Sequence, residues 1–248
     1  MKSQNQTRRS PDGRPARSAR SAKPGTRPGA RQAAQATHSN RKVFIAIAGN
    51  IGSGKSSLTR LLSQHFGWTP FYESVEDNPY LGDFYGNMKR WSFNLQVYFL
   101  SNRFRSHKAI TEGKKSVILD RVIYEDAEIF ARNLFEIGNM EERDYTNYVE
   151  LYKVMTEYLR APDLLIYLRA SVETLQKQIA LRGRDFEQSI SKEYLQQLNS
   201  HYEDWTTRYT KGPLLTVESD GLDFVNKADD LNAVVRMIKK KLGRRLSP

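Results

Sequence analysis

The chain has no cysteine among its 248 residues, which excludes disulfides and thiolate metal sites. Its four histidines lie far apart in the sequence and lack the spacing of zinc ligands. No run of about 18 apolar residues occurs, so we expect no membrane-spanning helix. The first residues also lack the apolar stretch of a secretory signal. These absences favour a soluble protein of the reducing cytoplasm.

Large apolar side chains are missing from the first 40 residues. Residues 1–40 contain no Val, Ile, Leu, Phe, Tyr or Trp, yet they carry nine Lys and Arg and a single acid, Asp12. They therefore account for +8 of the formal net charge of +11. Such a segment cannot bury enough apolar surface to offset the entropy of ordering. We predict a disordered basic tail over 1–40 and a folded domain over 41–248.

Three roles are open for this tail. We favour a solubilising or modulatory extension. Its Arg and Ser content also suits an organelle transit peptide, which would direct the protein to mitochondria, but its Pro and Gly residues oppose an amphipathic helix. Binding of nucleic acid by the basic residues is the role we favour least.

A continuous apolar run begins at residue 43, as expected for a strand buried on both faces. Similar runs recur and alternate with longer stretches of helical periodicity, which implies parallel strands joined by right-handed crossovers. We predict one doubly wound α/β domain without internal repeats. Its strands are expected over 43–48, 70–72, 116–119, 164–168 and 214–217. Its helices are expected over 54–66, 81–110, 123–137, 141–159, 171–181, 191–209 and 223–242.

The first strand is followed by a loop that matches the pattern G-x-x-x-x-G-K-[ST] without deviation. Its glycines let backbone N–H groups surround an anion, and the next helix adds its positive N-terminal end. Lys55 is expected to neutralise the β- and γ-phosphates of ATP, and the Ser56 hydroxyl to ligate Mg²⁺. The predicted ATP-binding residues here are Gly49, Asn50, Ile51, Gly52, Ser53, Gly54, Lys55, Ser56 and Ser57.

Carboxylates at the ends of two other strands distinguish among classes of phosphate-loop protein. A motor-type ATPase usually carries an acidic pair after a hydrophobic strand, whereas the strand over 116–119 ends in Asp120-Arg121. An arginine beside the carboxylate favours contact with a transferring phosphoryl group over activation of a hydrolytic water. Glu73 closes the second strand, at the ligand crevice of an open α/β sheet. There it can accept the proton of an attacking hydroxyl.

Four further motifs follow the phosphate loop, at 73–85, 90–103, 120–126 and 181–188. With these motifs the sequence resembles the deoxynucleoside kinase family over roughly residues 43–218, and especially its bacterial purine-preferring branch. The resemblance implies the P-loop kinase fold, with a doubly wound parallel five-stranded sheet flanked by helices and an arginine-rich lid. It also implies a homodimer.

The resemblance implies roles at the phosphate end of the site. Glu73 would be the base that deprotonates the nucleoside 5′-hydroxyl. Arg121 would contact that hydroxyl and the transferring phosphoryl group, and Asp120 would serve the Mg²⁺ ion and the acceptor side. Arg182 and Arg184 would belong to the lid that closes over the phosphates of ATP.

The resemblance also implies how the deoxynucleoside is held. Tyr85 and Glu187 would bind the deoxyribose 3′-hydroxyl. Gln96, Arg103 and Asp126 would read the edge of the base, and the Gln96 amide offers both a donor and an acceptor for it.

The predicted reaction is ATP- and Mg²⁺-dependent phosphorylation of a deoxynucleoside 5′-hydroxyl in nucleotide salvage. Family members that prefer thymidine carry uncharged residues in place of Arg103 and Asp126, so the retained charges indicate deoxyadenosine, deoxyguanosine or deoxycytidine. The segment 78–81 resembles the bacterial purine enzymes and favours deoxyadenosine.

Two positions depart from the family pattern. Val122 follows Asp-Arg where Ser is usual, which puts a hydrogen bond near Arg121 in doubt. Gln178 stands four residues before Arg182, where an arginine is usual. This puts contacts of the lid with ATP in doubt, although the adjacent Lys177 could compensate in part.

Two other functions compete with this prediction. A thymidylate-kinase-like enzyme also pairs a phosphate loop with Asp-Arg after the third strand, but it acts on a monophosphate and should carry extra arginines for that phosphate. A nucleotide-dependent protein that grips nucleic acid through residues 1–40 would show salt-sensitive binding that is lost with the tail. The acceptor-side residues argue against both.

Overall fold

A computed structural model describes residues 42–73 and 78–243, and the tail predicted over 1–40 lies outside them. A sheet of five parallel strands runs through the domain in the order β2-β3-β1-β4-β5. This confirms the predicted doubly wound α/β class. The strands are β1 (Phe44–Gly49), β2 (Thr69–Phe71), β3 (Val117–Asp120), β4 (Leu164–Arg169) and β5 (Leu214–Glu218).

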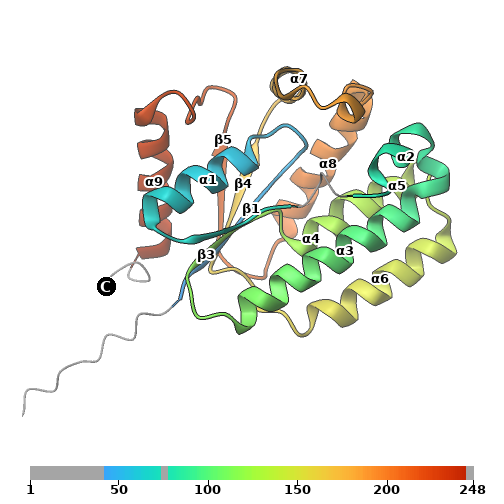
Figure 1. Cartoon of the computed structure of the whole chain (residues 1–248), viewed down its shortest axis with the longest axis horizontal. Coiled ribbons are helices and arrows are strands. Elements are labelled where there is room, and N and C mark those ends of the chain that lie inside the picture. The colour runs from blue at the N-terminus through green and yellow to red at the C-terminus, as the bar shows by residue number, and fades with distance from the viewer. Residues whose placement is uncertain (1–41, 74–77, 244–248) are drawn as a thin grey trace, which may run out of the picture. The chain divides into compact units, whose positions relative to one another are not determined.

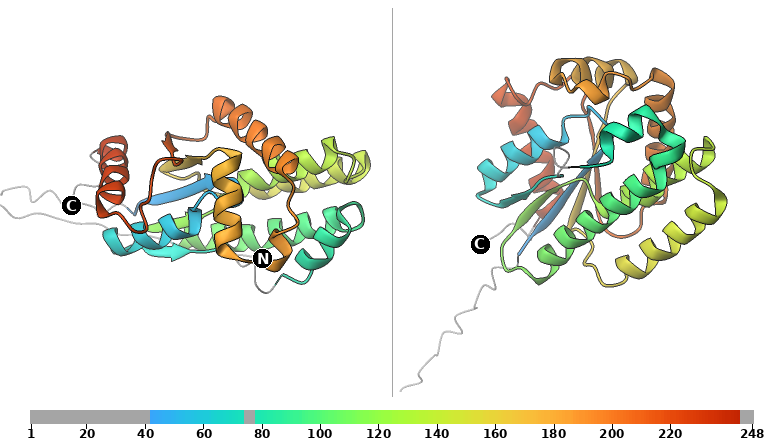
Figure 2. Two further views of the ribbon diagram at one scale, coloured as in Figure 1. Left: turned by 90° about the horizontal axis from the view of Figure 1, so that it is seen from above. Right: turned by 45° about the vertical axis from the view of Figure 1, so that its right-hand side comes forward.

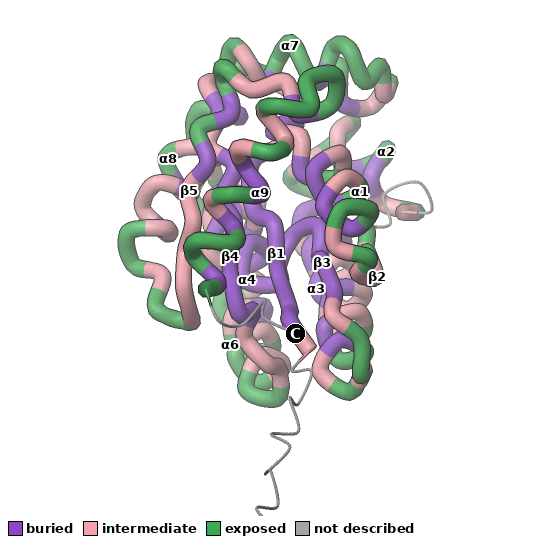
Figure 3. The backbone as a smooth tube through the Cα atoms, turned by 90° about the vertical axis from the view of Figure 1, so that its left-hand side faces the viewer, coloured by how far each residue is buried: buried purple, intermediate pink, exposed green. Residues whose placement is uncertain are grey.

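The central strand β1 is buried on both faces, as its unbroken apolar sequence predicts. Alternate side chains enter two separate cores: Ile45 and Ile47 lie in one, and Ala46 and Ala48 in the other. Figure 3 shows β1, β3 and β4 as the buried centre of the domain, with exposed residues on the outer helices. The end of β1, where the phosphate loop begins, is therefore held at the middle of the sheet.

Helices cover both faces of the sheet (Figures 1 and 2). The helices α1 (Lys55–Phe66) and α9 (Ala228–Leu242) pack on the face that carries Ile45 and Ile47. The opposite face carries the larger layer, with α3 (Met88–Glu112), α6 (Glu142–Thr156) and α8 (Lys192–Arg208). No helix in the described part of the chain is long and apolar enough to cross a bilayer.

The helix predicted over 81–110 is divided in two. It consists of α2 (Leu81–Gly86) and α3, which meet at Asn87. The backbone of Asn87 leaves the helical region, and its side chain accepts a hydrogen bond of 3.1 Å from the Arg90 N–H. Asn87 is therefore an N-cap for α3, and the break lets α2 turn toward the site.

Two other predicted helices differ in detail. The segment predicted over 123–137 is helical, but it consists of α4 (Ile123–Glu125), the π-helical turn η1 (Asp126–Ala131) and α5 (Arg132–Glu136). The last helix begins at residue 228, five residues later than predicted. The Asp230 carboxylate accepts a hydrogen bond of 2.8 Å from the Asp223 N–H, which holds the preceding turn against the first turn of α9.

The predicted lid lies between α7 (Val172–Arg182) and the short 3₁₀ helix η2 (Asp185–Glu187). α7 ends at Gly183, whose φ of 69° is left-handed backbone that glycine adopts without strain. The chain then crosses to η2, which contacts α2. The lid segment therefore connects the phosphate-loop side of the domain with the side formed by α2 and α3.

Candidate active site

The phosphate loop connects β1 to α1, and its path depends on left-handed glycines. Gly52 has a φ of 83°, and a Cβ there would lie 2.7 Å from the Leu175 carbonyl oxygen, so a larger residue does not fit. Lys55 begins α1 and is buried, with its Nζ 2.8 Å from the Asn50 carbonyl oxygen. Burial, together with the positive charge of Arg121, lowers the pKa of Lys55 to about 7. An anion at this loop would stabilise the charged amine.

Asp120 ends β3 and lies against the start of α1. Its Oδ2 is 2.5 Å from the Ser56 Oγ, and its buried Oδ1 has no hydrogen-bond partner within the described residues. Mg²⁺ binds oxygen ligands and usually takes only one or two of them from the protein, with phosphates and water supplying the rest. Ser56 and Asp120 therefore fit the predicted ion. The described residues contain no cluster of three or more His, Asp or Glu that could hold a metal by itself.

Glu73 follows β2 and lies between two arginines. Its Oε1 accepts a bond of 2.8 Å from Arg103 Nη2, and its Oε2 accepts one of 3.0 Å from Arg121 Nε. Burial favours the neutral carboxyl, but the charges of Arg121 and Arg103 outweigh it and hold the pKa of Glu73 well below its ordinary value. The carboxylate is therefore ionised and able to accept a proton throughout the neutral pH range.

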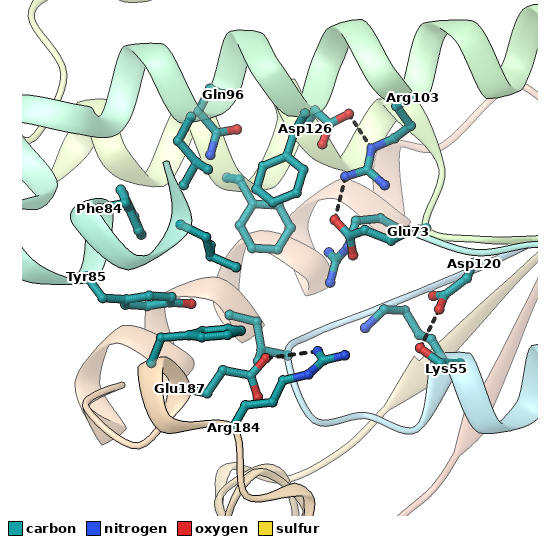
Figure 4. A pocket seen from close by; sticks show the side chains of 18 of the residues that line it. Lys55, Glu73, Phe84, Tyr85, Gln96, Arg103, Asp120, Asp126, Arg184 and Glu187 are labelled. Carbon is teal, nitrogen blue, oxygen red and sulfur yellow. Dashed lines mark hydrogen bonds and ion pairs between the residues drawn. The ribbon is translucent and has the colours of Figure 1, made fainter. Parts of the chain in front are cut away.

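The end of the site away from Lys55 and Asp120 is formed by Gln96, Arg103 and Asp126 (Figure 4). Arg103 Nε is 2.6 Å from Asp126 Oδ2, and both side chains are almost completely buried. Burial raises the pKa of Asp126 to about 6, although Arg103 opposes the shift, while the pKa of Arg103 is raised by its two carboxylate neighbours despite burial. The Gln96 Oε1 is buried without a hydrogen-bond partner within the described part of the chain. A ligand with an amino group could supply that bond.

The lid residues converge on one carboxylate. Glu187 is 5% exposed and bonds both Arg182 and Arg184, the latter at 3.3 Å. The neighbouring Phe186 ring stacks on Tyr85, with 6.1 Å between the ring centroids. Burial raises the pKa of Tyr85 far above its ordinary value, so its hydroxyl stays neutral and can donate a hydrogen bond. Tyr85 and Glu187 thus lie near each other at the side of the pocket (Figure 4).

One pocket brings the predicted substrate residues together, with about 840 Å³ of empty space including its open mouth. From the phosphate loop, only Ile51, Lys55 and Ser56 line it. Gln178 and Lys177 do not, because both are exposed on α7. The predicted residues that line the pocket are Lys55, Ser56, Glu73, Tyr85, Gln96, Arg103, Asp120, Arg121, Asp126, Arg182, Arg184 and Glu187.

Two features of the site were missed in the sequence. The first is its apolar lining, because an apolar residue of a pocket has the same sequence pattern as one of the core. The second is Glu125, whose side chain accepts a bond of 2.8 Å from the Val122 N–H, so that Glu125 and not residue 122 caps this turn. Its position three residues into the turn is the capping-box position, which was the available signal. The apolar lining residues include Leu81, Phe84, Leu95, Phe99, Phe130 and Phe186.

Phosphate-loop residues and a carboxylate suited to an acceptor hydroxyl line one pocket, and Arg121 is bonded to that carboxylate. This arrangement defines a phosphotransferase site that uses an alcohol as acceptor. The family model described as "Deoxynucleoside kinase" matches residues 45–242. The chain therefore belongs to the deoxynucleoside kinase family and is a nucleotide-binding kinase, and the predicted family, fold and enzyme class are confirmed.

The chain is similar over most of its length to characterised members of this family. It is 37% identical over 203 residues to the deoxyadenosine/deoxycytidine kinase of Bacillus subtilis, which covers 81% of this chain and 94% of that protein. It is 42% identical over 208 residues to a deoxyguanosine kinase of Lactobacillus johnsonii, covering 80% and 92% respectively. Among solved structures, the deoxyadenosine kinase of M. mycoides with bound dCTP superposes with a TM-score of 0.71 at 30% identity. That match covers 80% of this chain and 100% of the other. The matches favour a deoxynucleoside kinase over a thymidylate-kinase-like enzyme.

Proposed function

We propose that the enzyme transfers the γ-phosphoryl group of ATP to the 5′-hydroxyl of deoxyadenosine, with deoxyguanosine or deoxycytidine as secondary substrates. The observation that carries this proposal is the position of Glu73, bonded to Arg103 on the base side and to Arg121 on the phosphate side. A hydroxyl at Glu73 would lie between the residues suited to binding a nucleobase and those suited to binding phosphates.

Glu73 accepts the proton of the 5′-hydroxyl as the oxygen attacks the γ-phosphorus. The bond from the γ-phosphorus to the β–γ bridging oxygen breaks, and ADP leaves with that electron pair. Because the pKa of Glu73 is low, the carboxylate is a weak base, which suits a loose transition state in which the proton is lost late. Arg121 and Lys55 neutralise the equatorial oxygens, and Arg182 and Arg184 close over the phosphates from the lid.

Mg²⁺ bound by the Ser56 hydroxyl and the Asp120 carboxylate would neutralise charge on the β- and γ-phosphates. The Asp120 Oδ1, which has no hydrogen-bond partner among the described residues, supports this assignment, because a buried carboxylate oxygen needs a partner. Phosphate transfer should therefore require a divalent cation, and chelation by EDTA should abolish it. The remaining predicted loop residues, from Gly49 to Ser57, form the turn that would surround the phosphates of ATP.

The preference for deoxyadenosine follows from acceptors at the base end of the pocket. Because the pKa of Asp126 is about 6, its carboxylate is ionised above that pH, and both Asp126 and the Gln96 Oε1 can accept hydrogen bonds from a ligand. They suit a base with an exocyclic amine, such as adenine or cytosine, better than thymine, which has a carbonyl at that position. The relatives named deoxyguanosine kinase and deoxyadenosine kinase support a purine, and the one named deoxyadenosine/deoxycytidine kinase supports deoxycytidine as a secondary substrate. Tyr85 and Glu187 would hold the 3′-hydroxyl and leave little room for a ribose.

The test is phosphorylation of the four deoxynucleosides, the ribonucleosides and the deoxynucleoside monophosphates with ATP and Mg²⁺. We expect the highest kcat/KM with deoxyadenosine and little activity on monophosphates. Faster turnover of thymidine monophosphate than of any nucleoside would contradict the proposal.

As part of the same proposal, the enzyme is a cytoplasmic homodimer that acts in nucleotide salvage. Exposed apolar residues on α6 and just beyond it support a dimer through this helix: Leu151 is 40% exposed, Val154 55% and Tyr158 73%. Light scattering should give twice the monomer mass of 28.6 kDa, and Val154→Glu should give a monomer. The mitochondrial alternative depends on residues 1–40, and loss of these residues on entry into mitochondria would support it.

A further inference from the structure

Glu125 is completely buried at the centre of the site, yet it does not line the pocket. Its carboxylate accepts four hydrogen bonds from three separate parts of the chain. A buried carboxylate is costly unless donors surround it, and this one is well supplied. Its donors are the Gly49 N–H at 3.2 Å, the Arg121 Nη1 at 3.3 Å, the Val122 N–H at 2.8 Å and the Tyr202 hydroxyl at 2.6 Å.

Tyr202 brings α8 into the same network. Its hydroxyl lies 2.6 Å from Glu125 Oε1, 2.8 Å from the Gly49 carbonyl oxygen and 3.1 Å from Arg121 Nη1. The ring is buried and stacks on Tyr167 with 5.5 Å between centroids, so the hydroxyl has little freedom to move. Burial, reinforced by the charge of Glu125, raises the pKa of Tyr202, so the group remains a donor. Tyr202 and Glu125 thus join Arg121 to the first residue of the phosphate loop.

Arg121 needs such support because its backbone has an unfavourable conformation. It is the only non-glycine residue with positive φ in the described part of the chain, with φ at 70°. A non-glycine residue in this region is strained and persists where its surroundings hold it. Its Nε bonds Glu73, its Nη1 bonds Glu125 and Tyr202, and its guanidinium lies 4.6 Å from the centre of the Phe130 ring. Both the direction and the depth of the guanidinium are therefore set by neighbouring side chains.

We propose that Glu125 and Tyr202 are positioning residues that fix Arg121 relative to the phosphate loop, so that the guanidinium meets the transferring phosphoryl group in a constant geometry. The inference rests on the proposed function only through the role given to Arg121. A misplacement of about 1 Å in a group of this kind can cost on the order of 100-fold in rate. A network that merely stabilised the fold would not act through Arg121.

Tyr202→Phe removes only the hydroxyl and keeps the stacked ring. We expect kcat to fall by about tenfold or more, with the KM values for ATP and deoxyadenosine changed by less than about threefold. Tyr209→Phe is the matched control, because Tyr209 lies at the end of the same helix and its buried hydroxyl has no hydrogen-bond partner within the described residues. Its kcat should be unchanged. A Tyr202→Phe enzyme with wild-type kcat would overturn the proposal.

A double-mutant cycle separates positioning from stability. The Arg121→Lys background lowers kcat by itself, and in it Tyr202→Phe should change kcat by less than about twofold. Tyr202→Phe should still lower the Tm in this background. An equal fold-loss in both backgrounds would overturn the positioning role alone. Wild-type kcat in Arg121→Lys would overturn both that role and the proposed function of Arg121. If Tyr202→Phe does not fold, Glu125→Gln takes its place in the same cycle, with the same expected outcomes.

Discussion

Arg103 donates a hydrogen bond of 2.8 Å to Glu73, so the residue proposed to read the base is bonded directly to the residue proposed to accept the proton. The same guanidinium holds Asp126 at 2.6 Å. Any nucleobase that draws Arg103 or Asp126 toward itself therefore changes the surroundings of Glu73. An arginine neighbour lowers the basicity of a carboxylate. A shift of Arg103 toward the nucleobase of the substrate would therefore make Glu73 a stronger proton acceptor. Recognition and catalysis thus share one hydrogen-bonded chain.

The first prediction concerns Glu73→Gln, which keeps the shape of the side chain and one acceptor oxygen, and so one of the two arginine hydrogen bonds, but removes the general base. We expect kcat to fall by about 100-fold or more, as for loss of a general base, while the Kd for deoxyadenosine changes only severalfold. Steady-state kinetics and calorimetric titration measure the two quantities. Glu112→Gln at the exposed end of α3 is a matched control. Turnover that matches the wild type would remove Glu73 from the reaction.

The second prediction is a change of base preference. Replacing Arg103 by Met and Asp126 by Ala removes both charges and leaves room for the thymine methyl group. We expect the ratio of kcat/KM for thymidine to that for deoxyadenosine to rise by about tenfold or more, because the amine of adenine loses its acceptor. Competition between the two nucleosides in one reaction measures the ratio. An unchanged ratio would mean that these residues do not read the base.

The single variants serve as controls for this exchange. Removal of one partner of a buried ion pair is costly, whereas removal of both is often tolerated. The double variant should therefore unfold at a Tm closer to wild type than Arg103→Met does, because the single variant leaves Asp126 buried without its cation.

The sheet and the phosphate loop could be predicted from the sequence because their signals are local. Unbroken apolar runs such as 43–48 indicate strands buried on both faces, and the glycine pattern before Lys55 has a single common geometry. The break at Asn87 was missed because apolar periodicity continues across it. The N-cap there depends on one side-chain hydrogen bond, and Gly86 followed by Asn87 was the only local sign of it.

The network around Arg121 could not be predicted because its members are distant in sequence. Tyr202 lies 77 residues from Glu125, and nothing in the composition of α8 distinguishes Tyr202 from an ordinary core tyrosine. The pair is found only when the fold brings α8 beside the phosphate loop. The Asn50 side chain, which donates to the Leu195 carbonyl oxygen at 2.9 Å, makes a second contact of this kind.

The third prediction is a dependence on pH through Asp126, whose pKa burial raises to about 6. The charged groups that face it are Arg103, Glu73 and Arg121. Because the ionised carboxylate is the form that orients Arg103 and accepts from the base, kcat/KM for deoxyadenosine should fall as the pH drops below about 6. Asp126→Asn should remove this limb of the profile. A profile of the same shape in both enzymes would contradict the assignment.

Protonation of Asp126 should lower kcat/KM but raise the stability of the folded protein. Its pKa is raised from 3.8 in the unfolded chain to about 6 in the folded protein, so the folded state binds an extra proton between these values. Through this group the free energy of unfolding therefore rises as the pH falls from about 6 to about 4. In Asp126→Asn this contribution should be absent, and the difference in Tm between the two proteins should vary with pH across that window.

The last prediction concerns the basic segment 1–40. The described domain begins at Lys42, whose Nζ donates to the carbonyl oxygens of Ile110, Thr111 and Gly113. We expect the fragment 41–248 to keep kcat and both KM values within about twofold of the full chain, because residues 1–40 carry no large apolar side chain that a core would need. Labelled single-stranded DNA should bind the full chain no better than the fragment, and salt-sensitive binding confined to the full chain would support a nucleic-acid role for residues 1–40. A collapse of kcat in the fragment would contradict the disordered tail and would give residues 1–40 a part in the active enzyme.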